Sequence, residues 1–336
     1  MEYTAPWGGA GKYAPAQATW RDAHTQPEVV KDYRLVPPMS GGAVDILGRG
    51  ATLMRYGVHV PIFNEYADPR RLAELARDAE EAGWDGFFLW DHIMWHAVDP
   101  WVALTAIALN TERIHFGPLV TPLPRRRPWK VARETVSLDR LSGGRLILGV
   151  GIGGGSDEFD YLGEEPDPKV RGAMLDEGLE LLTRLWSGQV VQHDGQFYHV
   201  RHTQFTPTPI QQPRIPIWVA GMWPNKAPFR RATRWDGACP QGRGLPFDQQ
   251  MSPQAIAEVV AYIAQQGAPP IELIHEGFTP GHDRPSDAAT VAAYAAVGVT
   301  WWMENVSPWR YGWNWQGPYP VEQMRARVRG GPPRVD

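Results

Sequence analysis

Residues 68–92 read DPRRLAELARDAEEAGWDGFFLWDH and contain one complete helix–turn–strand unit. Asp68-Pro69 is a helix start signal, because the aspartate caps free backbone N–H groups and proline fits the first helical turn. Apolar side chains repeat at helical spacing over positions 72–79, and Gly83 predicts the end of the helix. The apolar run 86–90 is typical of a strand that is buried on both faces.

The same unit recurs along the rest of the chain. Asp99-Pro100 and Ser252-Pro253 repeat the helix start signal. Eight short apolar runs are strand candidates: 55–61, 86–90, 114–121, 145–150, 215–220, 237–240, 271–275 and 299–304. Helical segments separate these runs, so the sequence predicts an α/β fold, a (β/α)8 TIM barrel over residues 54–336, rather than an open doubly wound sheet.

Two stretches fall outside this alternation. Residues 189–214 carry an Asp194-Gly195 turn between two β-like runs, which predicts a hairpin insertion between strands four and five. Residues 1–53 are rich in glycine and proline and show neither helical nor strand periodicity. They are expected to form an N-terminal extension that is partly disordered.

The composition excludes several function classes. The 336 residues include 33 basic and 37 acidic side chains, a net charge of −4, which argues against a nucleic-acid or membrane-surface partner. Neither a secretory signal nor an apolar run of the ~18 residues that span a bilayer is present, so we expect a soluble, cytoplasmic protein. The single cysteine, Cys239, excludes a disulfide framework and suits a reducing compartment.

Tryptophan is unusually frequent, with 16 residues. Seven of them lie at or near the ends of strands two, five and eight: Trp90, Trp95, Trp218, Trp223, Trp301, Trp302 and Trp309. A generic core would scatter them, so this clustering favours an apolar cleft over a tryptophan-rich core.

The chemistry of a barrel is built at the carboxyl ends of its strands. Strand two ends in Trp90-Asp91-His92, and a histidine beside a carboxylate can act as acid or base near neutral pH. The alternative is an aspartate that caps the next turn beside an incidental histidine. Strands seven and eight end in Glu276 and Glu304. Glu304 follows two tryptophans and is expected to face an aromatic-walled mouth, the alternative being a salt bridge, for example to Arg310.

Three other strand ends carry signals for an anionic or flat ligand. Thr121-Pro122 leads into Arg125, Arg126 and Arg127, which could hold an anion or form a solvated basic loop. Strand four opens into a loop whose glycines let a ligand approach the backbone, or simply make it flexible: Gly151, Gly153, Gly154 and Gly155. Strand five ends in small residues that would expose backbone N–H groups to phosphate: Ala220, Gly221 and Met222.

Several catalytic motifs are missing from the sequence. Strand one carries His59-Val60-Pro61 instead of H-x-H, and neither H-E-x-x-H nor G-x-S-x-G occurs. No metal ligands are therefore predicted. Two further classes stay open: a metal-dependent barrel hydrolase would purify with zinc or manganese, and a non-catalytic barrel would bind no cofactor.

The order and spacing of five segments form a recognisable pattern: Tyr56 to Pro61, Ala79 to His92, Arg113 to Pro122, Leu138 to Gly151, and Pro216 to Gly221. With them, the chain resembles the bacterial luciferase-like flavin-dependent oxidoreductases over roughly residues 54–335. That family consists of (β/α)8 barrels that use reduced FMN or the deazaflavin coenzyme F420. In such an enzyme the flavin carries the redox chemistry, and the protein supplies positioning, a proton donor and a dry pocket.

The resemblance implies a role for each candidate residue. The flavin ring would lie against Thr121 and Pro122, and its phosphate would lie at Gly151–Gly155 and Ala220–Met222. Asp91-His92 matches the pair that faces the cofactor in the deazaflavin branch, with Glu304 as a further polar contact. Arg125 would bind the acidic tail of the cofactor. The apolar walls would come from Trp90, Trp95, Trp223 and Trp302.

The resemblance favours a two-component monooxygenase that uses reduced FMN on a small apolar organic molecule. A separate flavin reductase would then be its partner, and a homodimer is a further expectation. The alternative is an F420-dependent hydride-transfer oxidoreductase. One deazaflavin subgroup carries a glutamate where Gly154 stands here, so the sequence argues against a sugar-phosphate dehydrogenase.

Overall fold

The structure is a computed structural model that describes residues 54–93, 96–155 and 158–335. The predicted extension 1–53 and Trp95 lie outside the described residues. The strands are β1 (Arg55–Val60), β2 (Gly86–Leu89), β3 (His115–Pro118), β4 (Thr121–Pro122), β5 (Leu148–Gly151), β6 (Val190–Asp194), β7 (His199–Gln204), β8 (Ile217–Trp223), β9 (Gly237–Gly242), β10 (Glu272–Gly277) and β11 (Trp301–Asn305). The α-helices are α1 (Pro69–Glu81), α2 (Pro100–Asn110), α3 (Pro128–Ser142), α4 (Pro168–Trp186), α5 (Ala227–Ala232), α6 (Pro253–Ala264), α7 (Arg284–Ala295) and α8 (Val321–Arg329).

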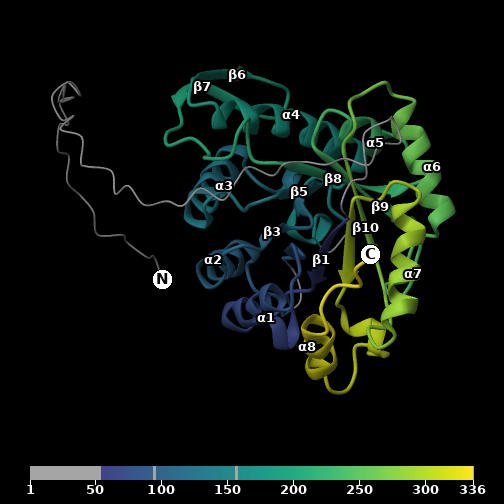
Figure 1. Ribbon diagram of the computed structural model, residues 1–336. Helices are drawn as coiled ribbons and strands as arrows, with labels where there is room; N and C mark the ends of the chain where they lie inside the picture. Colours follow the sequence, from purple (N-terminus) through teal and green to yellow (C-terminus); the bar gives the residue numbers. More distant parts are fainter. Residues whose placement is uncertain (1–53, 94–95, 156–157, 336) are drawn as a thin grey trace, which may run out of the picture. The chain divides into compact units, whose positions relative to one another are not determined.

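Nine parallel strands form one sheet in the order β3-β2-β1-β11-β10-β9-β8-β5-β4, with helices around it (Figure 1). The sheet closes where the Phe116 N–H of β3 donates to the Arg145 carbonyl at 3.1 Å and Ile147 donates back to Phe116 at 2.9 Å. β3 and β4 are two pieces of the single strand predicted over 114–121, with a cis peptide between Leu119 and Val120. The barrel predicted from the sequence is thereby confirmed.

The helix start signals work as the sequence predicts. The Asp68 side chain accepts from the backbone N–H of Arg70, the Asp99 side chain accepts from two N–H groups, and the Ser252 hydroxyl accepts from Ala255. Each is followed by proline in the first helical turn. These caps satisfy donors that the helix itself leaves free, so they fix where the helices begin.

The inside of the barrel is filled with large side chains: Phe88, Leu119, Ile147, Trp218, Cys239, Ile274, Trp301 and Met303. Glycines make room for the indoles, because a Cβ on Gly86 would lie 2.9 Å from the Trp301 ring and one on Gly237 would lie 2.5 Å from the Trp218 ring. Trp302 alternates to the outer face and packs against Tyr294 of α7. All three tryptophans are fully buried, so the predicted apolar cleft explains only part of the tryptophan excess.

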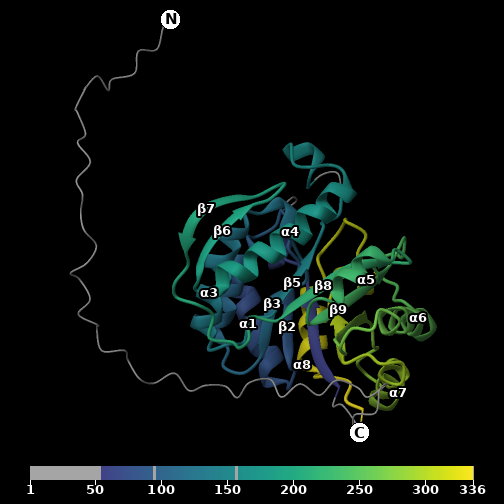
Figure 2. The same cartoon turned by 90° about the horizontal axis from the view of Figure 1, so that it is seen from above.

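The predicted insertion is confirmed as the antiparallel hairpin β6–β7, which lies beside α3 and α4 (Figures 1 and 2). Its loop turns where the Gly195 N–H donates to the Tyr198 carbonyl at 3.1 Å. Glu177 of α4 fixes the loop by accepting from three successive backbone N–H groups, at positions 196–198. Within the described residues, no helix has both the length and the apolar character that crossing a membrane requires.

Candidate active site

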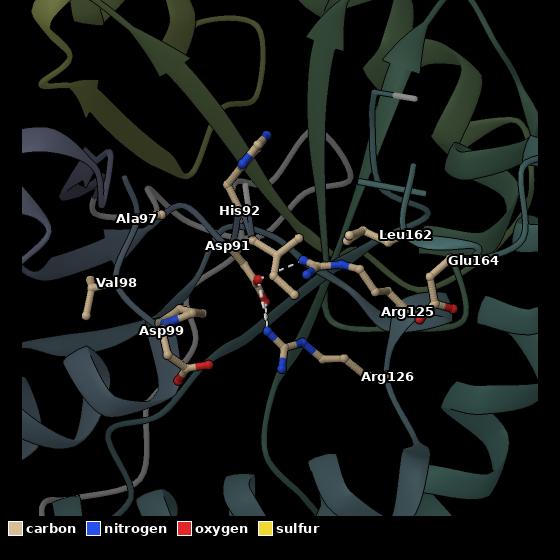
Figure 3. A pocket seen from close by; sticks show the side chains of 11 residues that line it. Asp91, His92, Ala97, Val98, Asp99, Arg125, Arg126, Leu162 and Glu164 are labelled. Carbon is tan, nitrogen blue, oxygen red and sulfur yellow. Dashed lines mark hydrogen bonds and ion pairs between the residues drawn. The ribbon is translucent and has the colours of Figure 1, made fainter. Parts of the chain in front are cut away.

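Asp91, directly after β2, is surrounded by hydrogen-bond donors. Its carboxylate accepts from the Thr121 hydroxyl and from the guanidiniums of Arg125 and Arg126, the latter two at 3.0 and 2.7 Å. The Asp91 side chain is 1% exposed. Figure 3 shows the carboxylate pointing toward both arginines. Asp91 is therefore the buried counter-ion of the loop that follows β4.

His92 extends away from the Asp91 carboxylate (Figure 3). Its Nδ1 lies 3.9 Å from the Glu158 carboxylate, and its side chain is 15% exposed. Glu158 also accepts from the Ile93 N–H at 3.0 Å and pairs with Arg125 at 3.4 Å. The carboxylate next to the imidazole is thus Glu158, which sequence reasoning missed. No local pattern marks Glu158, because it reaches His92 only through the fold of the loop after β5.

His92 and Asp91 line a cavity of about 250 Å³ between three strand-end loops (Figure 3). Its lining comprises Asp91, His92, Ile93, Ala97, Val98, Asp99, Pro100, Arg125, Arg126, Leu162 and Glu164. Across the described ranges, no group of three or more histidine, cysteine, aspartate or glutamate side chains is placed to hold a metal ion.

The arginine loop is largely neutralised by its own carboxylates. Arg125 is 5% exposed and pairs with both Asp91 and Glu158, and Arg126 pairs with Asp91. Arg127 is the exposed member of the three. A guanidinium between two carboxylates has little charge left for a distant anion, so the clearest task of Arg125 here is to hold the His92 loop in place.

The predicted cofactor-binding glycines lie at the carboxyl end of β5. Gly151 faces the barrel interior, where a Cβ would lie 2.9 Å from Val120 and 4.0 Å from Ala220. Gly153 adopts a φ of +80°, and a Cβ on Gly154 would meet nothing within 4 Å. Gly155 is exposed, as is Met222 at 45%, next to Gly221 near the end of β8. Thr121 and Pro122 are buried at β4. The wall formed by β5 and β8 is therefore lined by small side chains.

Glu304 forms a salt bridge, which is the alternative that the sequence left open. It is fully buried and pairs with Arg310 of the segment after β11 at 2.8 Å and with Arg327 of α8 at 3.1 Å. Thr279 and the Trp302 indole also donate to it. Burial raises the pKa of Glu304, but the two guanidiniums and these hydrogen bonds outweigh burial and hold it below its ordinary value. Strand alternation turns Glu304 outward, away from the barrel mouth.

Two of the predicted wall tryptophans also face outward. Trp223 packs against Phe229 and Tyr262 and donates to Glu258, and Trp302 lies between β11 and α7. Trp90 does face the mouth, where its ring stacks on Trp309 at 5.6 Å. It belongs to an aromatic cluster whose other members come from distant loops: Phe63, Phe247, Trp309, Trp313, Trp315 and Tyr319.

A third group at the mouth was not predicted as a site. His59 of β1, Glu276 of β10 and Asn305 of β11 all face inward, and Glu276 Oε1 lies 3.0 Å from His59 Nδ1 and 2.6 Å from Asn305 Nδ2. In the strand register, His59 is paired with Asn305, and Glu276 is paired with the inward-facing Met303. The sequence names His59 and Glu276 at strand ends, but only this register brings them together.

Comparison with known proteins agrees with this architecture. The sequence profile of the luciferase-like monooxygenase family matches residues 54–301. An F420-dependent glucose-6-phosphate dehydrogenase from Gordonia bronchialis is 34% identical over 203 residues, which cover 58% of this chain and 60% of that protein. The chain therefore spans less than two thirds of the length of this relative.

Two solved structures share the fold at low sequence identity. An F420-dependent secondary alcohol dehydrogenase in complex with an F420-acetone adduct superposes with a TM-score of 0.67 at 16% identity, covering 84% of this chain and 99% of that one. A monooxygenase from Streptomyces bottropensis gives 0.65 at 18% identity, covering 82% and 97%. The barrel and the profile match agree: this chain belongs to the luciferase-like monooxygenase family, a family of oxidoreductases, and is an enzyme.

Proposed function

We propose that the protein is an F420-dependent oxidoreductase that transfers a hydride between the deazaflavin and a small organic substrate. The observation that carries this proposal is the placement of Asp91-His92, with both residues lining the cavity and the carboxylate held by its ion pairs with the arginine loop. This pair matches the one that the deazaflavin branch is expected to place against its cofactor. The name of the curated relative supports the same cofactor. The FMN-dependent monooxygenase favoured by the sequence becomes the rival, because the monooxygenase neighbour shares only the fold.

The residues at the mouth fit a flat cofactor. Gly151 and Ala220 leave the β5–β8 side lined by small groups, so a planar ring can approach the backbone there. The exposed side chains of Lys226 and Arg243 follow the ends of β8 and β9 at the same rim. Cations at that rim suit the anionic tail of a deazaflavin better than the paired Arg125 does.

The protein's own side chains position the reactants and exchange a proton with them. Bound F420 supplies or accepts the hydride, so this chain has to position the reactants and manage a proton. His92, held beside Glu158, can give or take, at its exposed edge, the proton that a deazaflavin exchanges when its redox state changes. Asp91, Arg125 and Arg126 hold the two loops that carry His92 and Glu158, which fixes the imidazole in one place.

The substrate that we propose is not a sugar phosphate. Gly154 has room for a larger side chain yet carries none, so the glutamate of the sugar-phosphate subgroup is absent. Arg125 and Arg126 are already neutralised by Asp91 and Glu158. Without a free, buried cation among these groups, a phosphorylated substrate would lack its main recognition element.

An anaerobic assay tests the proposal directly. The full chain is mixed with oxidised F420 and a panel of primary and secondary alcohols, and loss of the oxidised deazaflavin absorbance is followed. We expect reduction with at least one alcohol and little with glucose 6-phosphate. Product formation that requires reduced FMN and oxygen, without F420 reduction by any alcohol, would overturn the assignment.

Replacing His92 separates catalysis from cofactor binding. We expect His92→Ala to lower turnover by about 10²–10⁴-fold, the usual contribution of a general acid or base, while the Kd for F420 changes less than threefold. His96→Ala, an exposed histidine on the same loop, is the matched control and should leave both values unchanged. Unaltered turnover in His92→Ala would remove His92 from the catalytic residues.

A further inference from the structure

The buried polar atoms at the barrel mouth that have no hydrogen-bond partner among the described residues include His59 Nε2 and Asn305 Oδ1. The His59 side chain is 3% exposed. Leaving a buried donor or acceptor unpaired costs about 1–3 kcal/mol. His59 and Asn305 are paired in the register of β1 and β11, so we expect a ligand that binds there to satisfy both atoms.

Glu276 sets the orientation of the imidazole. Burial raises the pKa of Glu276, but the charge and hydrogen bond of His59 and the hydrogen bond from Asn305 outweigh burial and hold this pKa below its ordinary value, so the carboxyl stays ionised. An ionised carboxylate only accepts, so His59 Nδ1 donates to Glu276. The other ring nitrogen, Nε2, is thereby left to accept or donate a proton to whatever enters the mouth.

His59 and Asn305 lie on the opposite side of the barrel from the wall formed by β5 and β8. In the closed sheet, β1, β11 and β10 lie across from β8, β5 and the β3–β4 strand, which carry Ala220, Gly151 and Val120. The neighbour of His59 is instead an aromatic surface, with the Trp90 ring at 5.9 Å and Trp309 stacked on Trp90. A ligand on this side would meet indole faces around one polar spot.

We propose that His59, positioned by Glu276 and assisted by Asn305, binds the oxygen of an alcohol or carbonyl substrate with an apolar body and exchanges a proton with it at Nε2. This rests on the proposed F420 chemistry. In carbonyl reduction, the hydride of reduced F420 forms the new C–H bond, the π pair of the C=O moves to oxygen, and that oxygen takes the proton from His59 Nε2. Reduced F420 would lose a proton together with that hydride, and His92 can accept this proton, so that F420 is oxidised and the carbonyl is reduced to the alcohol. Asn305 Oδ1 accepts a hydrogen bond from the resulting hydroxyl.

Two substitutions at position 59 separate the two ring nitrogens. Asparagine places an amide nitrogen near the position of Nδ1 and nothing at Nε2, whereas glutamine can reach the position of Nε2. Binding of cyclohexanol to the full chain is measured by ligand-observed NMR without any cofactor. We expect His59→Asn to weaken cyclohexanol binding about tenfold, His59→Gln to retain it within threefold, and both to lower F420-linked turnover by about 10²-fold or more. His202→Gln, on the exposed hairpin, is the control and should match the wild type.

Glu276→Gln tests the positioning role. We expect a lower kcat with an almost unchanged KM, because the oxygen still binds while the orientation of the imidazole is lost. KM and kcat that change together, or a kcat equal to that of the wild type, would contradict the positioning role.

The NMR measurement of cyclohexanol binding uses no cofactor, so the proposed F420-dependent function and the proposed oxygen site at His59 can fail separately. Cyclohexanol binding that is lost in His59→Asn, in a protein that never reduces F420, would overturn the proposed function and support the oxygen site. Equal binding to the wild type and to His59→Asn would overturn the oxygen site, as would a wild type that does not bind cyclohexanol.

Discussion

The buried carboxylate of Asp91 accepts hydrogen bonds from one hydroxyl and two guanidiniums. The sequence predicts that Asp91 and His92 lie at the end of a barrel strand, because apolar runs and helix caps locate strand ends well. It does not predict that the two side chains face in opposite directions. It also gives no sign of Glu158, which depends on the path of a loop.

Removing the Asp91 carboxylate should be costly. Asp91→Ala leaves Arg125 and Arg126 buried without their shared counter-ion, so we expect the free energy of unfolding to fall by about 3–5 kcal/mol in urea titrations. The matched control is Asp194→Ala on the hairpin, an exposed carboxylate whose loss should change stability by no more than about 0.5 kcal/mol. Similar small losses in both variants would mean that Asp91 is not the counter-ion described here.

At the scale of elements, helix starts were readable because Asp-Pro and Ser-Pro report a local capping interaction. The sequence did not show which side chains of β11 point into the barrel, because a strand that is buried on both faces carries no polar alternation to mark its inner side. Trp302 and Glu304 were therefore expected at the mouth, whereas the register turns both outward. Aromatic residues after β9 and β11, such as Phe247 and Trp313, were missed because they lie in loops without periodicity.

Glu304 ties α8 to the barrel through Arg327, and to the segment after β11 through Arg310. Glu304→Gln removes one partner of a buried pair, so we expect a loss of about 3–5 kcal/mol near neutral pH. The folded-state pKa of Glu304 is lowered, so its contribution is present above its ordinary pKa of 4.5 and is lost as the pH falls through the folded value.

The gap in stability between the wild type and Glu304→Gln should therefore narrow below pH 4.5, which denaturant titrations over a pH series can measure. Glu322→Gln, exposed in the first turn of α8, should cost less than about 1 kcal/mol. A gap that stays constant at acid pH would contradict the ionised pairing.

For the whole molecule, the family profile matches residues 54–301, and residues 1–53 lie outside the described structure. Closure of the barrel was predictable from eight recurring units. The distribution of tryptophans was not, because composition cannot separate indoles that fill the interior, such as Trp218, from those at the mouth, such as Trp90.

Buried histidines should make the protein sensitive to mild acid. Burial lowers the pKa of His275 to about 3 and that of His115 to about 4, against an ordinary value of 6.5. Below pH 6.5 the unfolded chain takes up protons that the folded chain refuses, so stability is lost as the pH falls toward these values. Within that window, each such histidine lowers the free energy of unfolding by about 1.4 kcal/mol for every unit by which the pH falls.

His275→Phe should remove one of these contributions, because the His275 ring is stacked on Tyr294 at 4.2 Å and phenylalanine can take its place. Between pH 6 and 4 we expect the stability of the variant to fall less steeply, by about 1 kcal/mol per pH unit. His202→Gln, which is exposed, should keep the wild-type slope. Parallel slopes in all three proteins would show that His275 is protonated in the folded state.

Preference for coenzyme F420 over FMN is the property on which the proposed function depends most directly. Titration of the full chain with each oxidised cofactor in the same buffer, followed by cofactor fluorescence, measures both dissociation constants. We predict that F420 binds at least tenfold more tightly than FMN, a difference of about 1.4 kcal/mol or more. Tighter binding of FMN, or no binding of either cofactor, would contradict an F420-dependent enzyme.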